Sequence, residues 1–349
     1  MSTMRFGMGV AYADAGFRET VDRIVELEAA GLDAVSVREA YTFDAVSQLG
    51  YIAARTSTIE IASGIVQIYT RTPSLTAMTA AGLDYVSDGR FTLGIGASGP
   101  QVIEGFHGVR YDAPIGRTRE LVDICRQVWR RERVQYQGRH YRIPLPEDEG
   151  TGLGKPLKLI NHPVRSRIPI LLAAIGPKNV ALAAELVEKW EPIFFHPGRA
   201  RDVWGGSLEA GRAKRSEDLP PLEVATAVGF AVGPGAGKLL ERVRPTLALY
   251  IGGMGARGQN FYTRLAERYG YETEAHDIQD LYLDGRKDEA AQKVPEELAH
   301  AVSLIGSEDE VAAQLREFAD AGVTQLNLEP LDPDHASTRA QLETLKSLA

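Results

Sequence analysis

Residues 60–90 read EIASGIVQIYTRTPSLTAMTAAGLDYVSDGR, and this stretch decides the fold. Its first part is an apolar run of strand character, which ends near Gly64, where a glycine allows the backbone to bend. Thr72 and Pro73 then supply the residue types preferred at the N-cap and at the first position of a helix. A buried strand, a short loop and a sharply started helix form the repeating unit of β/α barrels, whose sites lie where the strands end. We therefore expect a site in this loop.

Strand-like and helix-like segments alternate along almost the whole chain. The segments that we interpret as strands are Phe6–Ala11, Ala34–Arg38, Ile59–Val66, Phe91–Ala97, Ile168–Ala174, Pro192–His196, Leu222–Val232 and Val323–Leu328. Apolar residues at helical spacing precede or follow each of them. Eight strands that alternate with helices predict an α/β fold, a (β/α)8 TIM barrel with insertions. We expect one domain over residues 1–349.

Two regions interrupt the alternation, and we interpret both as insertions into the barrel. Residues 133–167 begin with a hairpin that turns at positions 137–138 and continue as a loop rich in proline and glycine. Residues 234–298 are mostly helical and too long for a simple connection. Beyond them, Ser307 and Glu310 have the spacing of a capping box at a helix start. Long excursions of this kind commonly carry substrate selectivity.

Composition excludes several classes of function. The chain has 349 residues, 44% of them hydrophobic, and a formal net charge of −8 without a basic stripe, which argues against a nucleic-acid partner. No apolar run approaches the ~20 residues of a membrane helix, and the first residues lack the pattern of a secretory signal. We therefore expect a cytoplasmic protein with a small-molecule substrate and neither a membrane nor a nucleic-acid partner.

Metal and nucleophilic chemistry find little support. The single cysteine, Cys125, excludes an internal disulfide, and its place in a helical apolar pattern indicates a packed thiol. The seven histidines show none of the close spacings of metal sites, so we predict no metal. The chain also has no Gly-x-Ser-x-Gly elbow, which disfavours hydrolysis by a serine nucleophile.

Residues 94–99 read GIGASG and match the G-x-G-x-x-G pattern of dinucleotide-binding folds. Those folds need a helix directly afterwards and an acidic strand-end residue roughly 20 positions later. Arg119 and Glu120, at that distance, lie inside a helical pattern, which disfavours this interpretation. We predict instead that small residues let backbone N–H groups approach an extended cofactor. The residues concerned are Gly96, Ala97, Ser98 and Gly99.

The helix that follows residues 168–174 has a candidate anion site at its start. Gly176 and Pro177 precede Lys178 there. The first N–H groups of a helix lack internal partners and its dipole is positive at this end, so the turn suits a phosphate. Lys178 would add a positive charge. The alternative is an ordinary helix start with a solvated lysine.

The chain resembles the deazaflavin-dependent members of the bacterial-luciferase-like superfamily, which include methylene-tetrahydromethanopterin reductase. The matching residues are Gly64, Ile65, Tyr69, Thr70, Arg71 and Pro73 after the third strand, with the turn Ser87, Asp88, Gly89 and Arg90. The resemblance implies a luciferase-like barrel, coenzyme F420 and hydride transfer between the deazaflavin and a small organic substrate, and we expect a homodimer. An FMN-dependent monooxygenase is the alternative within the same fold. A non-catalytic flavin-binding or deazaflavin-binding protein is the alternative from another class.

The resemblance also implies roles for single residues. The Gly64–Ile65 peptide bond is expected to be cis and to bulge against one face of the deazaflavin. Glu104 matches a glutamate close to the bound ring, where shelter from water would raise its pKa and suit a general acid. A surface or N-capping glutamate is the alternative. Gly176, Pro177 and Lys178 are expected at the cofactor phosphate.

The chain departs from some relatives at the end of the second strand, where they carry a histidine. It has Ala40 and Tyr41 there instead, so neither luciferase nor sugar-phosphate activity can be transferred to it. If the enzyme donates or accepts a proton at this place, the group that carries the proton must be Glu39, Tyr41 or water. Glu39 could equally form a structural ion pair with Arg71 or Arg38.

The helical insertion is expected to set substrate choice. Its side chains mix apolar bulk with a few hydrogen-bonding groups, as substrate pockets do. The candidate residues are Tyr250, Met254, Asn260, Phe261 and Tyr262. A purely structural helical patch or a subunit contact is the alternative.

Overall fold

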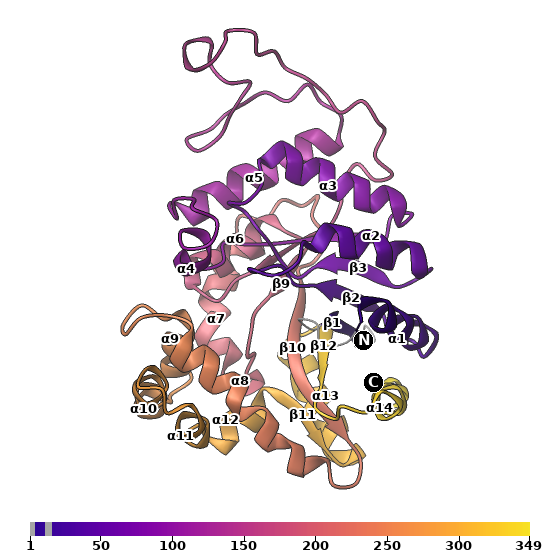
Figure 1. Ribbon diagram of the computed structural model, residues 1–349, viewed down its shortest axis with the longest axis vertical. Helices are drawn as coiled ribbons and strands as arrows, with labels where there is room; N and C mark the ends of the chain where they lie inside the picture. Colours follow the sequence, from indigo (N-terminus) through magenta and orange to yellow (C-terminus); the bar gives the residue numbers. More distant parts are fainter. Residues whose placement is uncertain (1–3, 11–15) are drawn as a thin grey trace.

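The protein is a closed barrel of parallel strands surrounded by helices, as the computed structural model in Figure 1 shows for residues 4–10 and 16–349. The barrel strands of this described part are β1 (Arg5–Val10), β2 (Ala34–Val37), β3 (Glu60–Ser63), β5 (Phe91–Gly96), β8 (Ile170–Ala173), β9 (Lys189–Glu191), β10 (Glu223–Val232) and β12 (Gln325–Pro330). Each strand pairs in parallel with the next, and β12 pairs with β1, which closes the barrel. The predicted (β/α)8 fold is confirmed. Ala11, the last residue of the predicted first strand, lies outside the described residues.

The sixth barrel strand lies earlier in the chain than predicted. The prediction of Pro192–His196 is wrong, because β9 covers Lys189–Glu191. Pro192 has no N–H to continue the ladder of hydrogen bonds. The apolar residues beyond it serve packing instead, since the ring of Phe195 stacks on Trp204 with centroids 5.5 Å apart.

Two short strands were not predicted as separate strands from the sequence. Strand β11 (Ser303–Gly306) pairs in parallel with the last residues of β10, outside the closed ring of eight. It has only four residues and follows a helix directly, so periodicity could not separate it. Strand β4 (Val66–Gln67) resumes the third strand after a short interruption and pairs with β5.

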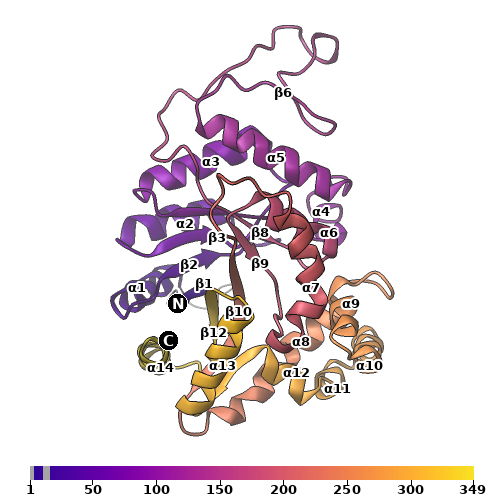
Figure 2. The same ribbon diagram turned by 180° about the vertical axis from the view of Figure 1, so that it is seen from behind.

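Helices cover the outside of the barrel, as the view from behind in Figure 2 also shows. Those of the barrel are α1 (Phe17–Ala29), α2 (Ala45–Arg55), α3 (Pro73–Val86), α4 (Pro100–Ile103), α5 (Pro114–Trp129), α6 (Pro177–Leu186), α7 (Pro197–Arg212), α13 (Glu308–Asp320) and α14 (His335–Leu348). Thr72 caps α3 through Leu75, and the capping box of Ser307 and Glu310 is present at α13, as predicted.

Both predicted excursions have regular structure. The hairpin pairs β6 (Tyr136–Gln137) with β7 (Arg142–Ile143), and the short turn η1 (Glu147–Glu149) follows it. The second excursion contains η2 (Ala236–Arg242), α8 (Arg244–Ala248), η3 (Leu249–Gly253), α9 (Phe261–Arg268), α10 (Glu272–Leu283), α11 (Lys287–Gln292) and α12 (Glu296–Ala301). Whether the chain behaves as one domain in solution stays a prediction.

The hydrophobic core lies between the strands and the helices. Alternate strand residues point outward, and large ones such as Phe6, Leu93 and Leu326 are fully buried. The ring of Phe6 lies 5.6 Å from Lys346 of α14, on the helical side. Residues of the other parity face the lumen, and apart from Leu171 of β8 they are mostly small or polar; they include Gly7, Gly9, Glu60, Thr92, Gly94, Lys189, Glu191, Gln325 and Asn327. The lumen is therefore largely polar, and we expect the site at its carboxyl end.

Candidate active site

The third strand is interrupted where the sequence predicts the site. β3 ends at Ser63 and β4 begins at Val66, and the intervening Gly64–Ile65 peptide bond is cis, as predicted. A Cβ at Gly94 would overlap the carbonyl oxygen of Ser63. A Cβ at Gly96 would lie 3.1 Å from the Ile65 side chain. The glycines of β5 therefore let the bulge pack closely, and a substitution at either one would displace it.

Glu39 is committed to an ion pair. Its two oxygens accept hydrogen bonds of 2.6 and 2.9 Å from the guanidinium of Arg71, and a third of 2.9 Å from the N–H of Ala45. Asp44, the N-cap of α2, accepts a further bond of 3.2 Å from Arg71. This geometry favours the structural role among the two considered for Glu39. It fixes the loop after β2 against the loop after β4.

Tyr41 lies on the rim of the barrel and is 67% exposed. Its ring centroid is 6.2 Å from that of Phe106, which follows α4. Phe43, on the same loop as Tyr41, is also exposed. The rim therefore presents aromatic side chains to solvent.

Glu104 is exposed at the end of α4. Because α4 is a single turn, the protein alone leaves Glu104 on the rim without shelter from water, and its place close to a bound ring stays a prediction. Its Oε1 accepts a hydrogen bond of 3.1 Å from the N–H of Tyr111. The hydroxyl of Tyr111 donates to the carbonyl of Ser98, whose backbone has a φ of 57°. These contacts hold Glu104 beside the loop of residues 96–99.

The turn before α6 is open to a ligand. Gly176 is the N-cap of this ten-residue helix, Pro177 occupies its first position, and Lys178 is exposed. A Cβ added at Gly176 or at Gly99 would have no atom within 4 Å, so both glycines border open space. Unpaired helix N–H groups and a lysine form a donor set that fits a phosphate. Together with the bulge, the residues present fit a flat cofactor that carries an anionic tail.

The carboxyl end of the lumen contains polar residues that the sequence analysis did not select. Arg38, just after β2, crosses above Gly9 of β1 and forms an ion pair with Glu329 of β12. Glu191 of β9 accepts a hydrogen bond of 3.0 Å from Nδ2 of Asn327. Burial raises the pKa of Glu191, and the nearby Arg38 opposes this effect. Spacing in the sequence could not reveal the cluster, since its members come from separate strands.

The helical insertion brings an aromatic wall to this end of the barrel. The ring of Tyr250 contacts those of Phe194 and Tyr262 edge to face, with centroids 5.1 and 4.9 Å apart. Burial raises the pKa of Tyr250, which also lies within electrostatic range of Arg38 and Glu329. Phe194 has a φ of 51°, an uncommon conformation for a bulky residue. The wall thus stands beside the ion pair at the lumen.

The other predicted residues of the insertion differ in role. Asn260 is 1% exposed and caps α9, while its Nδ2 donates to the carbonyls of Tyr250 and Ile251. This geometry favours a structural role for Asn260 over the predicted substrate contact. Met254 is 43% exposed and Phe261 is 48% exposed, so both are accessible.

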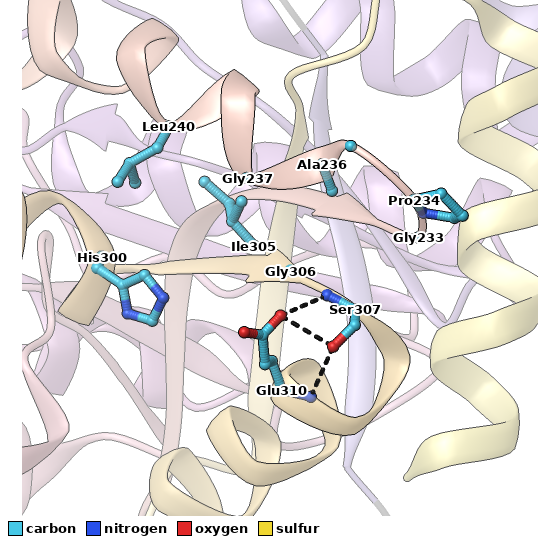
Figure 3. Close-up of a pocket in the computed structure, with 11 residues that line it drawn as sticks. Gly233, Pro234, Ala236, Gly237, Leu240, His300, Ile305, Gly306, Ser307 and Glu310 are labelled. Atoms are coloured by element: carbon cyan, nitrogen blue, oxygen red, sulfur yellow. Dashed lines mark hydrogen bonds between the residues drawn. The ribbon is translucent and has the colours of Figure 1, made fainter.

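Two cavities lie outside the polar cluster of Arg38, Glu191, Asn327 and Glu329. One, of about 360 Å³, is bordered by Tyr69, Arg71, Arg110 and Tyr141 and lies beside the loop after β4. The other, of about 280 Å³, is drawn in Figure 3 and lies between the glycine-rich loop after β10 and the start of α13. The capping box occupies that helix start, and three acidic residues follow Ser307 there, so this cavity disfavours an anion. No predicted site residue borders the second cavity.

A β/α barrel with a polar lumen, a bulged third strand and an open helix start belongs to the class of cofactor-binding barrel proteins. Residues 1–325 match the family model described as luciferase-like monooxygenase. A Mycobacterium tuberculosis protein, Rv3520c, whose name proposes a coenzyme F420-dependent oxidoreductase, is 40% identical over 93% of this chain and 94% of its own length. This chain therefore belongs to the luciferase-like monooxygenase family.

Solved structures show the same fold. Coenzyme F420-dependent tetrahydromethanopterin reductase from Methanopyrus kandleri has a TM-score of 0.80 at 23% identity, over 98% of this chain and 97% of its own. The oxygenating constituent of 3,6-diketocamphane monooxygenase of Pseudomonas putida, in complex with FMN, has a TM-score of 0.68 at 21% identity, over 99% and 97%.

Two kinds of feature are absent from the described residues. None of their helices is long and apolar enough to cross a membrane. No group of three or more His, Cys, Asp or Glu residues in this part of the chain is arranged to hold a metal ion.

Proposed function

We propose that this chain is a coenzyme F420-dependent oxidoreductase that transfers a hydride between the deazaflavin and a small organic substrate. The observation that carries the proposal is the 40% identity, over 93% of this chain, to a relative that is named for the same cofactor, together with the open glycine turn at the start of α6. When bound, F420 supplies the hydride chemistry, while the protein supplies binding, orientation and a proton.

The cofactor site extends from the bulge to the start of α6. Ile65 and the backbone of residues 96–99 would hold the deazaflavin ring. Gly176 borders open space that would admit a phosphate, and the exposed Lys178 would compensate its charge. Gly96 acts indirectly, because its missing side chain makes room for Ile65.

Protons are exchanged at the rim. Glu104 is the proposed proton donor, since it is accessible and is held by the N–H of Tyr111 beside the loop 96–99. Tyr41 is a second candidate from the opposite loop. Glu39 acts by positioning Arg71 and is not free to exchange a proton without breaking that pair.

The substrate lies against the insertion. Tyr250 and Tyr262 form the wall beside the lumen, and Met254 is accessible nearby in the chain. Asn260 holds this segment in place through the carbonyls of Tyr250 and Ile251. Replacing Tyr262 with alanine is therefore expected to change substrate preference and to leave cofactor affinity unchanged.

Titration with F420 and with FMN, each followed by cofactor fluorescence, tests the proposal. We expect saturable binding of F420, and turnover of bound cofactor once a substrate is found. Preferential binding of FMN with oxygen consumption would favour the monooxygenase alternative, which the fold shared with the FMN-containing Pseudomonas protein keeps open. Tight F420 binding without turnover of any substrate would favour the non-catalytic binding protein.

We also propose that the protein is a cytoplasmic homodimer. Helix α3 supports a dimer because it is buried on one side and still exposes large apolar residues on the other. These residues are Leu75, Met78, Tyr85 and Val86. Light scattering coupled to size exclusion measures the mass directly, and replacing Met78 with glutamate is expected to yield a monomer. A monomeric wild type would contradict the proposal.

A further inference from the structure

Glu191 differs from an ordinary structural carboxyl in the number of its partners. One oxygen accepts a hydrogen bond from Asn327, and no described residue donates to the other oxygen. The residue as a whole is partly accessible, although protein surrounds its carboxyl. Glu191 is the last residue of β9 and points into the lumen toward Asn327, so its carboxyl lies at the carboxyl end of the barrel.

A second glutamate in the lumen, Glu60, can be compared with Glu191. Glu60, in a lower layer, accepts hydrogen bonds from Arg5, Lys189 and Thr92. Its oxygens are therefore occupied, as expected for a carboxylate that only stabilises the fold. A buried carboxyl with a single amide donor costs stability, and such a residue is found where a ligand completes its contacts.

The neighbours of Glu191 hold it in one orientation. Gln325 donates through Nε2 to Oδ1 of Asn327 at 2.8 Å, and Asn327 donates in turn to Glu191. Gly7 of β1 makes room for this chain of amides, because a Cβ there would overlap Oδ1 of Asn327. Gln325 thus orients Asn327, and Asn327 directs its donor toward one oxygen of Glu191, which leaves the second oxygen for another donor.

The charged side chains near Glu191 restrict which chemical group of a substrate can bind there. Arg38 is paired with Glu329, and deeper in the lumen Arg5 and Lys189 are paired with Glu60. A phosphate or carboxylate of a substrate would therefore lie beside the carboxyl groups of Glu191 and Glu329, and these cations, already paired, would not be available to neutralise it. A neutral group with a hydrogen-bond donor meets no such penalty.

We propose that Glu191 and Asn327 form a substrate subsite at the floor of the barrel opening, where the free oxygen of Glu191 accepts a hydrogen bond from a neutral hydroxyl or N–H group. The inference rests on the proposed function and adds the class of substrate: a neutral molecule with a donor group, held between this floor and the wall of Tyr250 and Tyr262. Phosphorylated and carboxylated substrates are excluded from this position.

Fluorine NMR with small probes tests the subsite directly. The probes are trifluoroethanol, its methyl ether, which has no donor, and trifluoroacetate, an anion of similar size. Each is titrated into the wild type with and without saturating F420, and its line width gives the affinity. We expect the alcohol to bind about five- to tenfold more tightly than the ether, the factor typical of one hydrogen bond, and trifluoroacetate to bind most weakly.

Two variants assign this preference to Glu191. Glu191→Gln keeps the size of the side chain but can turn an NH2 group toward the opening, and Glu191→Leu removes the acceptor altogether. Both are expected to lose the preference for the alcohol over the ether. Glu185→Gln, on the outer helix α6, is the matched control and should keep it.

Each remaining outcome counts against the subsite. Equal binding of alcohol and ether to the wild type, no binding of either, or an unchanged preference in Glu191→Gln overturns the proposal. Trifluoroacetate binding more tightly than the alcohol overturns the inference about charge. A wild type that fails to bind F420 refutes the proposed function instead. The titrations without F420 then still measure whether the probes bind at the subsite.

Discussion

The two ends of the barrel lumen each hold a glutamate, and their surroundings are opposite. At the amino end, burial alone would raise the pKa of Glu60, but Lys189 and Arg5 together hold it below its ordinary value. At the carboxyl end, burial raises the pKa of Glu191, which has one amide donor. The amino end is a closed ion network, whereas the carboxyl end keeps unused hydrogen-bonding capacity. With the proposed subsite at Glu191, this difference separates stability and ligand binding along one lumen.

The largest effect is expected at the amino end. Glu60→Gln leaves Lys189, which is 4% exposed, without its nearest carboxylate, and among the described residues only Glu223 remains paired with it, at 3.4 Å. We expect a loss of about 3 kcal/mol in the free energy of unfolding, because a buried charge loses its partner. Urea denaturation measures this loss. Glu223→Gln is the control and should cost less than about 1 kcal/mol, since this residue is half-exposed. Equal losses in both variants would contradict the comparison.

The next effect is expected at the rim of the carboxyl end and should appear in turnover. Glu104→Gln removes a proposed proton donor that is exposed and contributes little packing. We expect turnover to fall about 10²-fold with an unchanged thermal midpoint. Glu39→Gln provides the contrast, because it breaks the bidentate pair with Arg71 and should lower the midpoint. Full activity of Glu104→Gln would show that Glu104 is not the proton donor and would leave it a structural role, as acceptor of the hydrogen bond from the N–H of Tyr111.

A smaller effect is expected for cofactor binding. Lys178→Ala should weaken F420 binding by about 1–3 kcal/mol, the range for a charged hydrogen bond, with turnover at saturating cofactor unchanged. Fluorescence titration measures the dissociation constant. Lys155→Ala, at an exposed lysine of the loop after the hairpin, is the control. An identical dissociation constant in Lys178→Ala and in the wild type would remove Lys178 from the phosphate site.

The smallest effect concerns pH and sharpens the comparison between the two glutamates. Because its pKa is raised, Glu191 binds its proton more tightly in the folded than in the unfolded state, so its contribution to stability is lost as pH rises through the raised pKa. Glu60, with a lowered pKa, loses its contribution as pH falls. Relative to the wild type, Glu191→Gln should therefore gain stability as the pH rises from about pH 5 to about pH 8. Urea denaturation at both pH values checks this, and a constant difference would contradict it.

Local sequence predicted much of the site on the third strand. The bend at Gly64, the capped start of α3 and the capping box of Ser307 follow from residue types that act on their immediate neighbours. The ion pair of Glu39 and Arg71 was one of two alternatives, and only the structure shows that both oxygens of Glu39 are occupied. The exposure of Glu104 also depends on how short α4 is, and periodicity does not give the length of a single turn.

The sequence by itself determined that the chain is a barrel of alternating strands and helices, because hydrophobic periodicity is a property of neighbouring residues. It also located the break in the third strand and the glycine turn before α6, whose phosphate role stays a prediction. Only the tertiary structure decided which lumen residues meet. Arg38 and Glu329 are 291 positions apart, and Glu191 and Asn327 are 136 apart. A period of two assigns each residue to a face of its strand, but closure of the barrel decides which strands share a layer, and that layer holds the chemistry.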